Sequence, residues 1–161
     1  MVKHIAPGPE SVWDYPRPPR VESVSAPIRI VFNGVVIAQS NRTFRVLETS
    51  HPPVYYIPRE DIQMQYLTTN PRRTFCEFKG QAAYWDLQVD AQESSLAAWS
   101  YPNPNSAYME IKDHLAFYAS RVDEAYVGSE KVQAQAGDFY GGWITSNIVG
   151  PFKGGPGTKG W

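Results

Sequence analysis

The most reactive residue types of this sequence occur in two short segments. The first contains Cys76, the only thiol, with Lys79 three residues later and Arg72 and Arg73 shortly before it. Neighbouring cations lower the pKa of a thiol and favour the nucleophilic thiolate, and His51 could act as its base if the fold brings the two together. The alternative interpretation is that Cys76 is an inert, small hydrophobic residue of the core.

The second segment combines charge with aromatic rings, and its polar and aromatic members are Arg45, Glu48, His51, Tyr55 and Tyr56. Arg45 and Glu48 are three positions apart, so on a regular strand they point to opposite faces. One of them could therefore face the interior, where a charge needs a partner or a pocket. The alternative is a solvated edge strand with ordinary ion pairs.

Chain-breaking residues bound both segments: Pro52-Pro53 and Pro58 on one side, Pro71 and Gly80 on the other. Such breakers place side chains at strand ends and in loops, where a rigid sheet can present them to a ligand. We therefore expect both segments to meet at one cavity. The expected catalytic residues are Cys76, His51 and Glu48. The expected ligand-binding residues are Arg45, Tyr55, Tyr56, Lys79, Trp99 and Tyr101.

This mixture of residues suits an anionic or carbonyl-bearing small molecule. Arg45 and Lys79 would supply positive charge, and arginine can bind a carboxylate or phosphate with two parallel hydrogen bonds. Glu48 would orient Arg45 or a water molecule, and His51 could carry a proton near neutral pH. The tyrosines would supply stacking surface and hydroxyl donors.

Length and composition exclude several classes of protein. The 161 residues suffice for one domain, and 15 basic against 16 acidic residues leave no excess of positive charge for a nucleic-acid surface. A single cysteine excludes an intrachain disulfide and a multi-thiolate metal site, and we expect no metal and no cofactor. No apolar run approaches the roughly 20 residues of a membrane span. Without a recognisable secretory signal, we expect a cytoplasmic protein.

The central part of the chain is predicted to consist mainly of β-strands. Ile28–Phe32 and Val35–Gln39 are β-branched runs separated by Asn33-Gly34, the strongest short signal for a hairpin. Further strands are predicted at Phe44–Glu48, at Val54–Ile57, at Ala82–Val89 with the Trp85 face toward the core, at Leu96–Tyr101, and in a final hairpin of Glu124–Val127 with Lys131–Gln133. Because proline cannot donate to a ladder, Val54–Ile57 should be short or lie at an edge, and Pro58 should begin one helical turn.

One long helix is predicted over about residues 107–121. Tyr108, Ile111, Leu115 and Tyr118 recur at helical spacing, and Ser106 could serve as its N-cap. The predicted fold class is therefore mainly β (α+β): a compact antiparallel sheet or partly open barrel with one long helix packed on it. The lack of alternating strands and helices argues against a doubly wound parallel sheet.

The two ends of the chain are predicted to be extended arms that pack on the domain. We divide the chain into a proline-rich arm (1–27), a β-rich domain (28–134) and a glycine- and aromatic-rich arm (135–161). Because the last arm carries aromatic rings, we expect Trp143 and Phe152 to be buried against the domain. The glycine run from residue 150 to residue 160 does not have the spacing of a phosphate-binding loop.

Several motifs resemble the bacterial family called domain of unknown function 427. They are R-V-L-E-T-S-H-P-P-V-Y-Y-I-P (45–58), T-F-C-E-F-K-G-Q-A-A-Y-W (74–85), A-W-S-Y-P (98–102) and A-F-Y (116–118). The resemblance implies a compact, mainly β domain, related to β-tent folds that often bind zinc through paired C-x-x-C motifs. With one cysteine, this chain cannot carry that zinc site. The family is also labelled nucleotidyltransferase-like, but we find no Gly-Ser motif followed by paired aspartates that would hold magnesium.

The resemblance leaves the function open. We expect a domain that binds a small polar or anionic molecule in an aromatic-lined pocket, with the question of an enzymatic activity unanswered. The alternative is a structural or protein-interaction module without catalysis. We expect neither nucleic acid nor membrane as partner, and we leave open whether the chain forms homo-oligomers.

Overall fold

The computed structural model describes residues 8–135 and 140–153. The first seven residues, residues 136–139 and the end of the chain from residue 154, with most of the glycine run, lie outside the described part. The described part is mainly β. Its strands are β1 (Glu10–Ser11), β2 (Arg20–Val24), β3 (Ile28–Phe32), β4 (Val35–Ser40), β5 (Thr43–Leu47), β6 (Val54–Tyr56), β7 (Leu67–Cys76), β8 (Gly80–Val89), β9 (Gln92–Ser100), β10 (Leu115–Phe117), β11 (Glu124–Val127), β12 (Glu130–Lys131), β13 (Gln133–Ala134), β14 (Trp143–Ile144) and β15 (Ile148–Val149). The short 3₁₀ helices are η1 (Val12–Asp14), η2 (Arg59–Asp61), η3 (Met64–Tyr66), η4 (Ser106–Ile111) and η5 (Ala119–Arg121).

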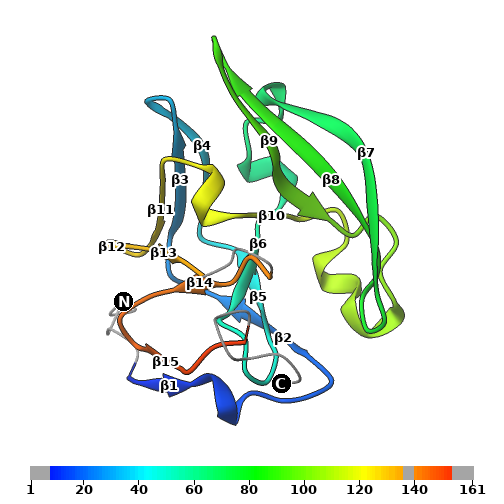
Figure 1. Cartoon of the computed structure of the whole chain (residues 1–161), viewed down its shortest axis with the longest axis vertical. Helices are drawn as coiled ribbons and strands as arrows, with labels where there is room; N and C mark the ends of the chain where they lie inside the picture. Colours follow the sequence, from blue (N-terminus) through cyan, green and yellow to red (C-terminus); the bar gives the residue numbers. More distant parts are fainter. Residues whose placement is uncertain (1–7, 136–139, 154–161) are drawn as a thin grey trace.

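The strands form several small sheets. Two sheets have four strands each, in the orders β10-β9-β8-β7 and β12-β11-β3-β4, and a third has the order β2-β5-β6. The pairing within these three sheets is antiparallel throughout. Figure 1 shows β7, β8 and β9 on one side of the molecule, β3, β4 and β11 on the other, and β6 and β10 between them. The described strands therefore form separate sheets and no closed barrel.

The Asn33-Gly34 hairpin is confirmed. Both turn residues have positive φ, 48° and 77°, as a type I′ turn requires, and β3 pairs with β4 across it. The predicted edge position of β6 is also confirmed, since β6 ends the order β2-β5-β6. The helical turn after Pro58 is η2. The sequence analysis did not predict β7, a long edge strand that bulges around Pro71 between Asn70 and Arg73.

The prediction of one long helix over residues 107–121 is wrong. The segment forms η4, then β10, then η5. Asp113 has a φ of 58°, in the left-handed region that interrupts a right-handed helix. The backbone of β10 then pairs with β9, and Leu115 also bridges to Ile57. The helical spacing therefore arose from apolar residues of separate elements.

The buried side chains form two main clusters on opposite sides of the β8–β9–β10 sheet. The larger cluster includes Ile30 of β3, Leu87 of β8 and Phe117 of β10. The second includes Tyr56 of β6, Trp99 of β9 and Tyr108 of η4. Because successive residues of a strand face opposite sides, Ala98 belongs to the first cluster and its neighbour Trp99 to the second.

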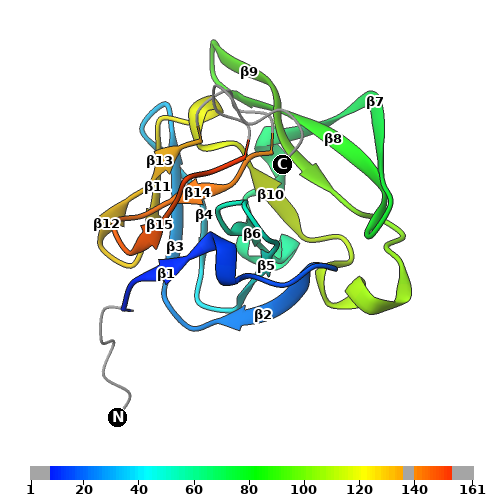
Figure 2. The same cartoon turned by 60° about the horizontal axis from the view of Figure 1, so that its bottom comes forward.

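Segments from both ends of the chain pack on these sheets. Trp143 is only 1% exposed and stacks on Tyr55 with ring centres 5.1 Å apart, whereas Phe152 is half-buried. Figure 2 shows β1 running beside β15, with which it pairs in parallel. Part of the predicted N-terminal arm is itself a sheet strand, since β2 pairs with β5 over five residue pairs.

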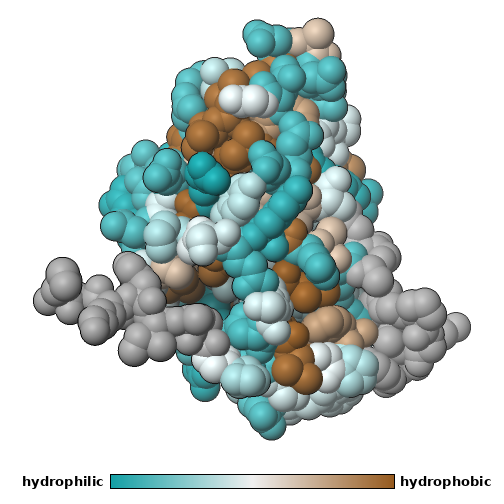
Figure 3. All heavy atoms as spheres, turned by 90° about the vertical axis from the view of Figure 1, so that its left-hand side faces the viewer, coloured by the Kyte–Doolittle hydropathy of each residue, from teal (hydrophilic) through white to brown (hydrophobic). Residues whose placement is uncertain are grey.

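The surface of the described part is mixed in polarity. On the face shown in Figure 3, hydrophobic atoms form separate groups divided by hydrophilic ones. The large hydrophobic side chains that are exposed come from distant parts of the chain: Trp13, Val36, Phe75, Met109 and Val149. Among the described residues, no helix combines the length and apolar character needed to cross a membrane.

Candidate ligand-binding site

A cavity of about 690 Å³ lies against the second buried cluster. Its aromatic lining comes from β6, β7, β8 and β9, from the segments that follow β7, β9 and β10, and from the segment that precedes β14. The lining rings of Tyr and Trp are Tyr56, Tyr84, Trp99, Tyr101, Tyr118 and Tyr140. Its charged lining residues are Glu48, Arg72, Glu77, Lys79, Arg121 and Lys153. The remaining polar and reactive lining includes His51 and Cys76.

Most of the site residues predicted from the sequence line this one cavity. They are Glu48, His51, Tyr56, Cys76, Lys79, Trp99 and Tyr101. The two predicted segments, one after β5 and one between β7 and β8, therefore meet in space. Nothing in the structure assigns a reaction to Cys76, His51 or Glu48, and their catalytic roles stay predictions.

Arg45 and Tyr55 do not line the cavity, in contrast to the expectation that they would. Arg45 lies directly opposite Tyr55 on the β5–β6 ladder and opposite Glu22 on the β2–β5 ladder. Residues that face each other across a ladder share one face of the sheet. The neighbouring pair of Val46 and Val54 occupies the other face, which does line the cavity.

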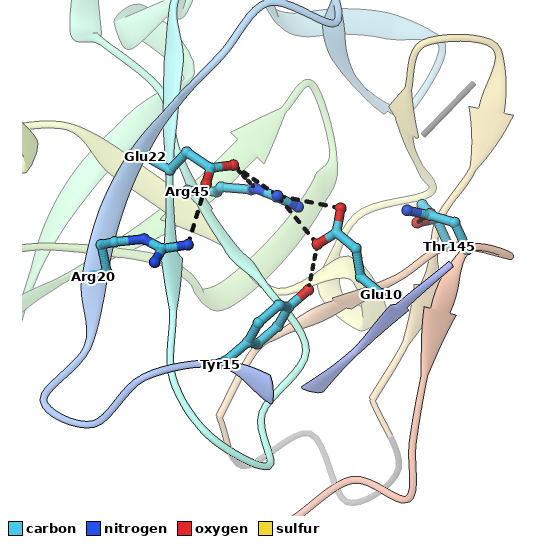
Figure 4. Close-up of polar contacts among 7 residues, drawn as sticks. Glu10, Tyr15, Arg20, Glu22, Arg45 and Thr145 are labelled. Carbon is cyan, nitrogen blue, oxygen red and sulfur yellow. Dashed lines mark hydrogen bonds and ion pairs between the residues drawn. The ribbon is translucent and has the colours of Figure 1, made fainter. Parts of the chain in front are cut away.

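The guanidinium group of Arg45 is held by two carboxylates away from the cavity. It lies 2.7 Å from a Glu22 oxygen and 3.1 Å from a Glu10 oxygen, and the Tyr15 hydroxyl donates to Glu10 at 2.8 Å (Figure 4). Burial lowers the pKa of Arg45, but the hydrogen bond to Glu22 and the surrounding negative charges outweigh burial and raise it. Burial and the Glu10 hydrogen bond raise the pKa of Tyr15. Arg45 thus ties the N-terminal segment to β5, and Glu48 pairs instead with Arg17 at 3.5 Å.

His51 is buried at the end of the cavity lined by Tyr140. Its Nδ1 lies 2.8 Å from the Thr49 carbonyl oxygen, and its ring meets the Tyr140 ring edge-on with centres 4.6 Å apart. Because a carbonyl can only accept, Nδ1 carries the proton and donates it. Burial lowers the pKa of His51, and the positive charges of Lys153 and Arg17 lower it further against the opposing effect of Glu48. His51 is therefore a neutral imidazole at neutral pH.

Lys79 is a buried cation in the turn between β7 and β8. Its residue is 9% exposed, and its Nζ lies 5.8 Å from the centre of the Tyr101 ring. Within the described part of the chain, no carboxylate lies within ion-pair distance of this ammonium group and no side-chain hydrogen bond engages it. Among the described residues, the Tyr101 ring is the contact that the structure gives to this charge.

All four Lys and Arg residues that line the cavity lie over tyrosine rings that line it too. The pairs are Arg72 over Tyr84 at 5.5 Å, Lys79 over Tyr101 at 5.8 Å, Arg121 over Tyr118 at 4.5 Å and Lys153 over Tyr140 at 5.4 Å. A cation over an aromatic face is attracted by the ring quadrupole. The cavity wall therefore combines positive charge with aromatic rings.

Two buried tyrosine hydroxyls add donors to the cavity. Trp99 donates its indole N–H to the Tyr56 hydroxyl at 3.4 Å, which leaves the Tyr56 proton for another acceptor. Burial raises the pKa of both Tyr56 and Tyr101, so both hydroxyls stay protonated. Cys76 lines the same cavity and packs against the buried cluster that contains Tyr56 and Tyr101.

Sequence reasoning missed several cavity residues, among them Tyr84, Tyr118, Tyr140 and Lys153. Tyr118 and Arg121 could have been paired from their i, i+3 spacing, which brings side chains together in a single helical turn. Tyr140 and Lys153 carried no local signal, because only the tertiary packing brings the C-terminal segment to the cavity. Among the described residues, no group of three His, Cys, Asp or Glu side chains is placed to hold a metal ion.

The comparison with protein families agrees with the motifs of the sequence. Residues 20–128 match the model of a domain of unknown function, DUF427. No curated protein matches the chain. The match spans more than half of the chain, includes every strand from β2 to β11, and covers most of the residues that line the cavity. The chain belongs to the DUF427 family.

Proposed function

We propose that this protein binds a small anionic molecule in the cavity beside β6 and β9. The observation that carries the proposal is Lys79, a residue only 9% exposed whose ammonium group faces the cavity and pairs with no carboxylate of the described residues. A buried charge without a counter-charge is costly. A bound anion would remove that cost, and it is the ligand class for which such a group is suited.

The distribution of charge around the cavity supports the same ligand class. Four Lys and Arg residues and two Glu residues line it, whereas the whole chain has a formal net charge of −1. One of the two acids, Glu48, is engaged by Arg17. A concave site with an excess of one sign of charge concentrates ligands of the opposite sign.

The aromatic rings argue against a cationic ligand and for an organic body on the anion. Cation-binding aromatic cages leave ring faces open for the ligand, but here the protein's own Lys and Arg side chains lie over four of the tyrosines. Trp99 and Tyr56 offer apolar surface beside the donors. The cavity volume falls in the range of about 300–1,000 Å³ that is typical of small-molecule sites.

Calorimetric titration with a matched pair of probes tests the proposal. Cyclohexylmethyl phosphate carries the anion, and cyclohexylmethanol is its neutral analogue. We expect the phosphate to bind and the alcohol to bind at least about tenfold more weakly, since charge-assisted hydrogen bonds contribute roughly 1.5–3 kcal/mol each. Native mass spectrometry of freshly purified protein should reveal a retained anion.

A matched pair of variants locates the binding. Lys79→Met should weaken binding of the phosphate about tenfold or more, whereas Lys131→Met, which removes an exposed cation of β12 outside the cavity, should leave it unchanged. Binding of both probes with equal affinity, or equal loss in both variants, would contradict the proposal. A reaction at Cys76, His51 or Glu48 is not part of it.

A further inference from the structure

The cavity presents hydrogen-bond acceptors beside its cations. The imidazole of His51 and the carboxylates of Glu48 and Glu77 all line it. An anion alone cannot satisfy these groups, because a phosphate or carboxylate oxygen only accepts when it is ionised. Facing acceptors would repel it. The lining is therefore built for a ligand that donates hydrogen bonds as well as carrying negative charge.

His51 is the most defined of these acceptors. Its Nδ1–H is committed to the Thr49 carbonyl at 2.8 Å, so Nε2 is the unprotonated nitrogen. Within the described residues, no hydrogen bond engages Nε2. The His51 side chain lines the cavity. A buried histidine, 7% exposed, thus offers one lone pair to whatever occupies the cavity.

We infer that the anion bound here is a hydroxylated one, a polyol phosphate ester or a polyhydroxy carboxylate, whose hydroxyl groups donate to His51 and the two glutamates while its oxyanion meets Lys79 and the tyrosine hydroxyls. This inference rests on the proposed function. A hydroxyl group both donates and accepts, so it suits a wall where acceptors and cations alternate. An ammonium group on the ligand could also donate to these acceptors, but it would be repelled by the four cations that line the cavity.

The aromatic surface that leads from Lys79 toward His51 fits the same ligand class. Ring contacts lead from Lys79 over Tyr101 to Tyr56, 6.3 Å away, and on to Trp99, 6.4 Å away. Trp99 then contacts Tyr118 at 4.6 Å, and Tyr140 contacts His51. The C–H faces of a ring-shaped polyol can pack on such a surface while its hydroxyls reach the polar wall.

Two matched pairs of probes test the inference by calorimetry. Glucose 6-phosphate is compared with cyclohexylmethyl phosphate, and quinate with cyclohexanecarboxylate. Each pair keeps a six-membered ring and the anion and differs in hydroxyl groups, and the first pair also differs in the ring oxygen. We expect the hydroxylated member of at least one pair to bind about tenfold tighter or more, because hydrogen bonds from its hydroxyl groups add to the binding of the anion. The pair that shows the preference identifies phosphate or carboxylate as the anion.

Variants of the acceptors provide the second readout, which is the affinity ratio within a pair. His51→Phe should reduce that ratio severalfold, and His51→Gln, which keeps an acceptor oxygen, should retain part of the ratio. Glu48→Met, at a less buried position, should also reduce the ratio and serves if His51→Phe does not fold.

The outcomes distinguish failure of this inference from failure of the proposed anion binding. If the hydroxyl-free anions bind as tightly as their hydroxylated partners in both pairs, the inference fails and anion binding stands. If no anion of either pair binds, the proposed function itself fails. If the preference exists but neither His51→Phe nor Glu48→Met reduces it, these acceptors are not its cause and the inference is overturned.

Discussion

Tyr55 and Tyr56 are consecutive in the chain, yet their rings lie on opposite faces of β6. Tyr55 packs on Trp143 in the larger core, whereas Tyr56 meets Trp99 and lines the cavity. The two-residue period of a strand is the cause. One tyrosine therefore belongs to the scaffold and its neighbour to the candidate site.

This relationship predicts different effects of two equivalent substitutions. Tyr56→Phe removes a protonated donor from the cavity and should weaken binding of cyclohexylmethyl phosphate about three- to tenfold. Tyr55→Phe should leave the affinity unchanged. Titration calorimetry of both variants, after circular dichroism has shown that both are folded, measures the difference. Equal affinity losses would mean that Tyr56 does not face the ligand.

Arg45 should matter for stability and not for binding. Arg45→Met leaves the carboxylates of Glu22 and Glu10 without their shared partner, and we expect a loss of about 2 kcal/mol in the free energy of unfolding. The control is Arg42→Met, which removes hydrogen bonds of 2.9 and 3.0 Å to Asp61. Because the Arg42 side chain is 58% exposed, its loss should cost less than about 1 kcal/mol.

Urea denaturation measures both variants of this pair. A smaller loss for Arg45→Met than for Arg42→Met would show that the Glu10–Arg45–Glu22 network does not anchor the N-terminal segment. Since Arg45 lies on the face of β5 away from the cavity, the affinity for cyclohexylmethyl phosphate should be the same in Arg45→Met and the wild-type protein.

His51 should make the protein less stable as the pH falls from about 7 to 5. Its pKa in the folded state is lowered, first by burial, so below the ordinary value of about 6.5 the unfolded chain binds a proton that the folded chain does not. The free energy of unfolding therefore rises with pH in this window. Urea titrations at several pH values should show this slope in the wild-type protein and a shallower slope in His51→Gln.

A second titration should appear at lower pH. The hydrogen bond from Arg42 lowers the pKa of Asp61, so this carboxylate stabilises the fold above its unfolded pKa of about 3.9 and loses that contribution as the pH falls further. Asp61→Asn should reduce the loss of unfolding free energy in that acidic range. It should leave the slope of unfolding free energy against pH between pH 5 and 7 unchanged. If His51→Gln shows the same slope between pH 5 and 7 as the wild-type protein, the pH dependence in that window comes from a group other than His51.

Gly141 should tolerate no side chain, because it packs on the cavity wall. A Cβ there would lie 2.3 Å from the Trp99 ring, and the residue has a φ of 70°. We expect Gly141→Ala to lower the free energy of unfolding by more than about 2 kcal/mol through strain and overpacking.

Gly128 provides the matched control for this substitution. Its φ is 62°, but a Cβ would meet nothing within 4 Å, so Gly128→Ala should cost only the strain of about 1–2 kcal/mol. Thermal and urea denaturation of the two variants separate overpacking from strain. Equal losses of unfolding free energy in the two variants would mean that the Trp99 ring moves aside for the added methyl group at low cost. Intrinsic tryptophan fluorescence would then report that displacement.

Local sequence signals were sufficient where the structure depends on neighbouring residues. Asn33-Gly34 predicted its hairpin because few residue pairs adopt two positive φ angles at low cost. The prolines around Val54–Tyr56 predicted a short edge strand because they cannot donate to a ladder. The mainly β character and the family followed from such patterns.

The tertiary structure decided everything that depends on which distant segments pair. Residues 107–121 have helical spacing, but the ladder of β10 with β9 and the left-handed Asp113 made them a strand between short turns. The register of β2 on β5 decided which groups Arg45 meets, because it places Glu22 directly opposite Arg45. Lys153 and Tyr140 reached the cavity only through the packing of the C-terminal segment. Long-range register and packing are properties of the whole chain, and no short stretch of sequence encodes them.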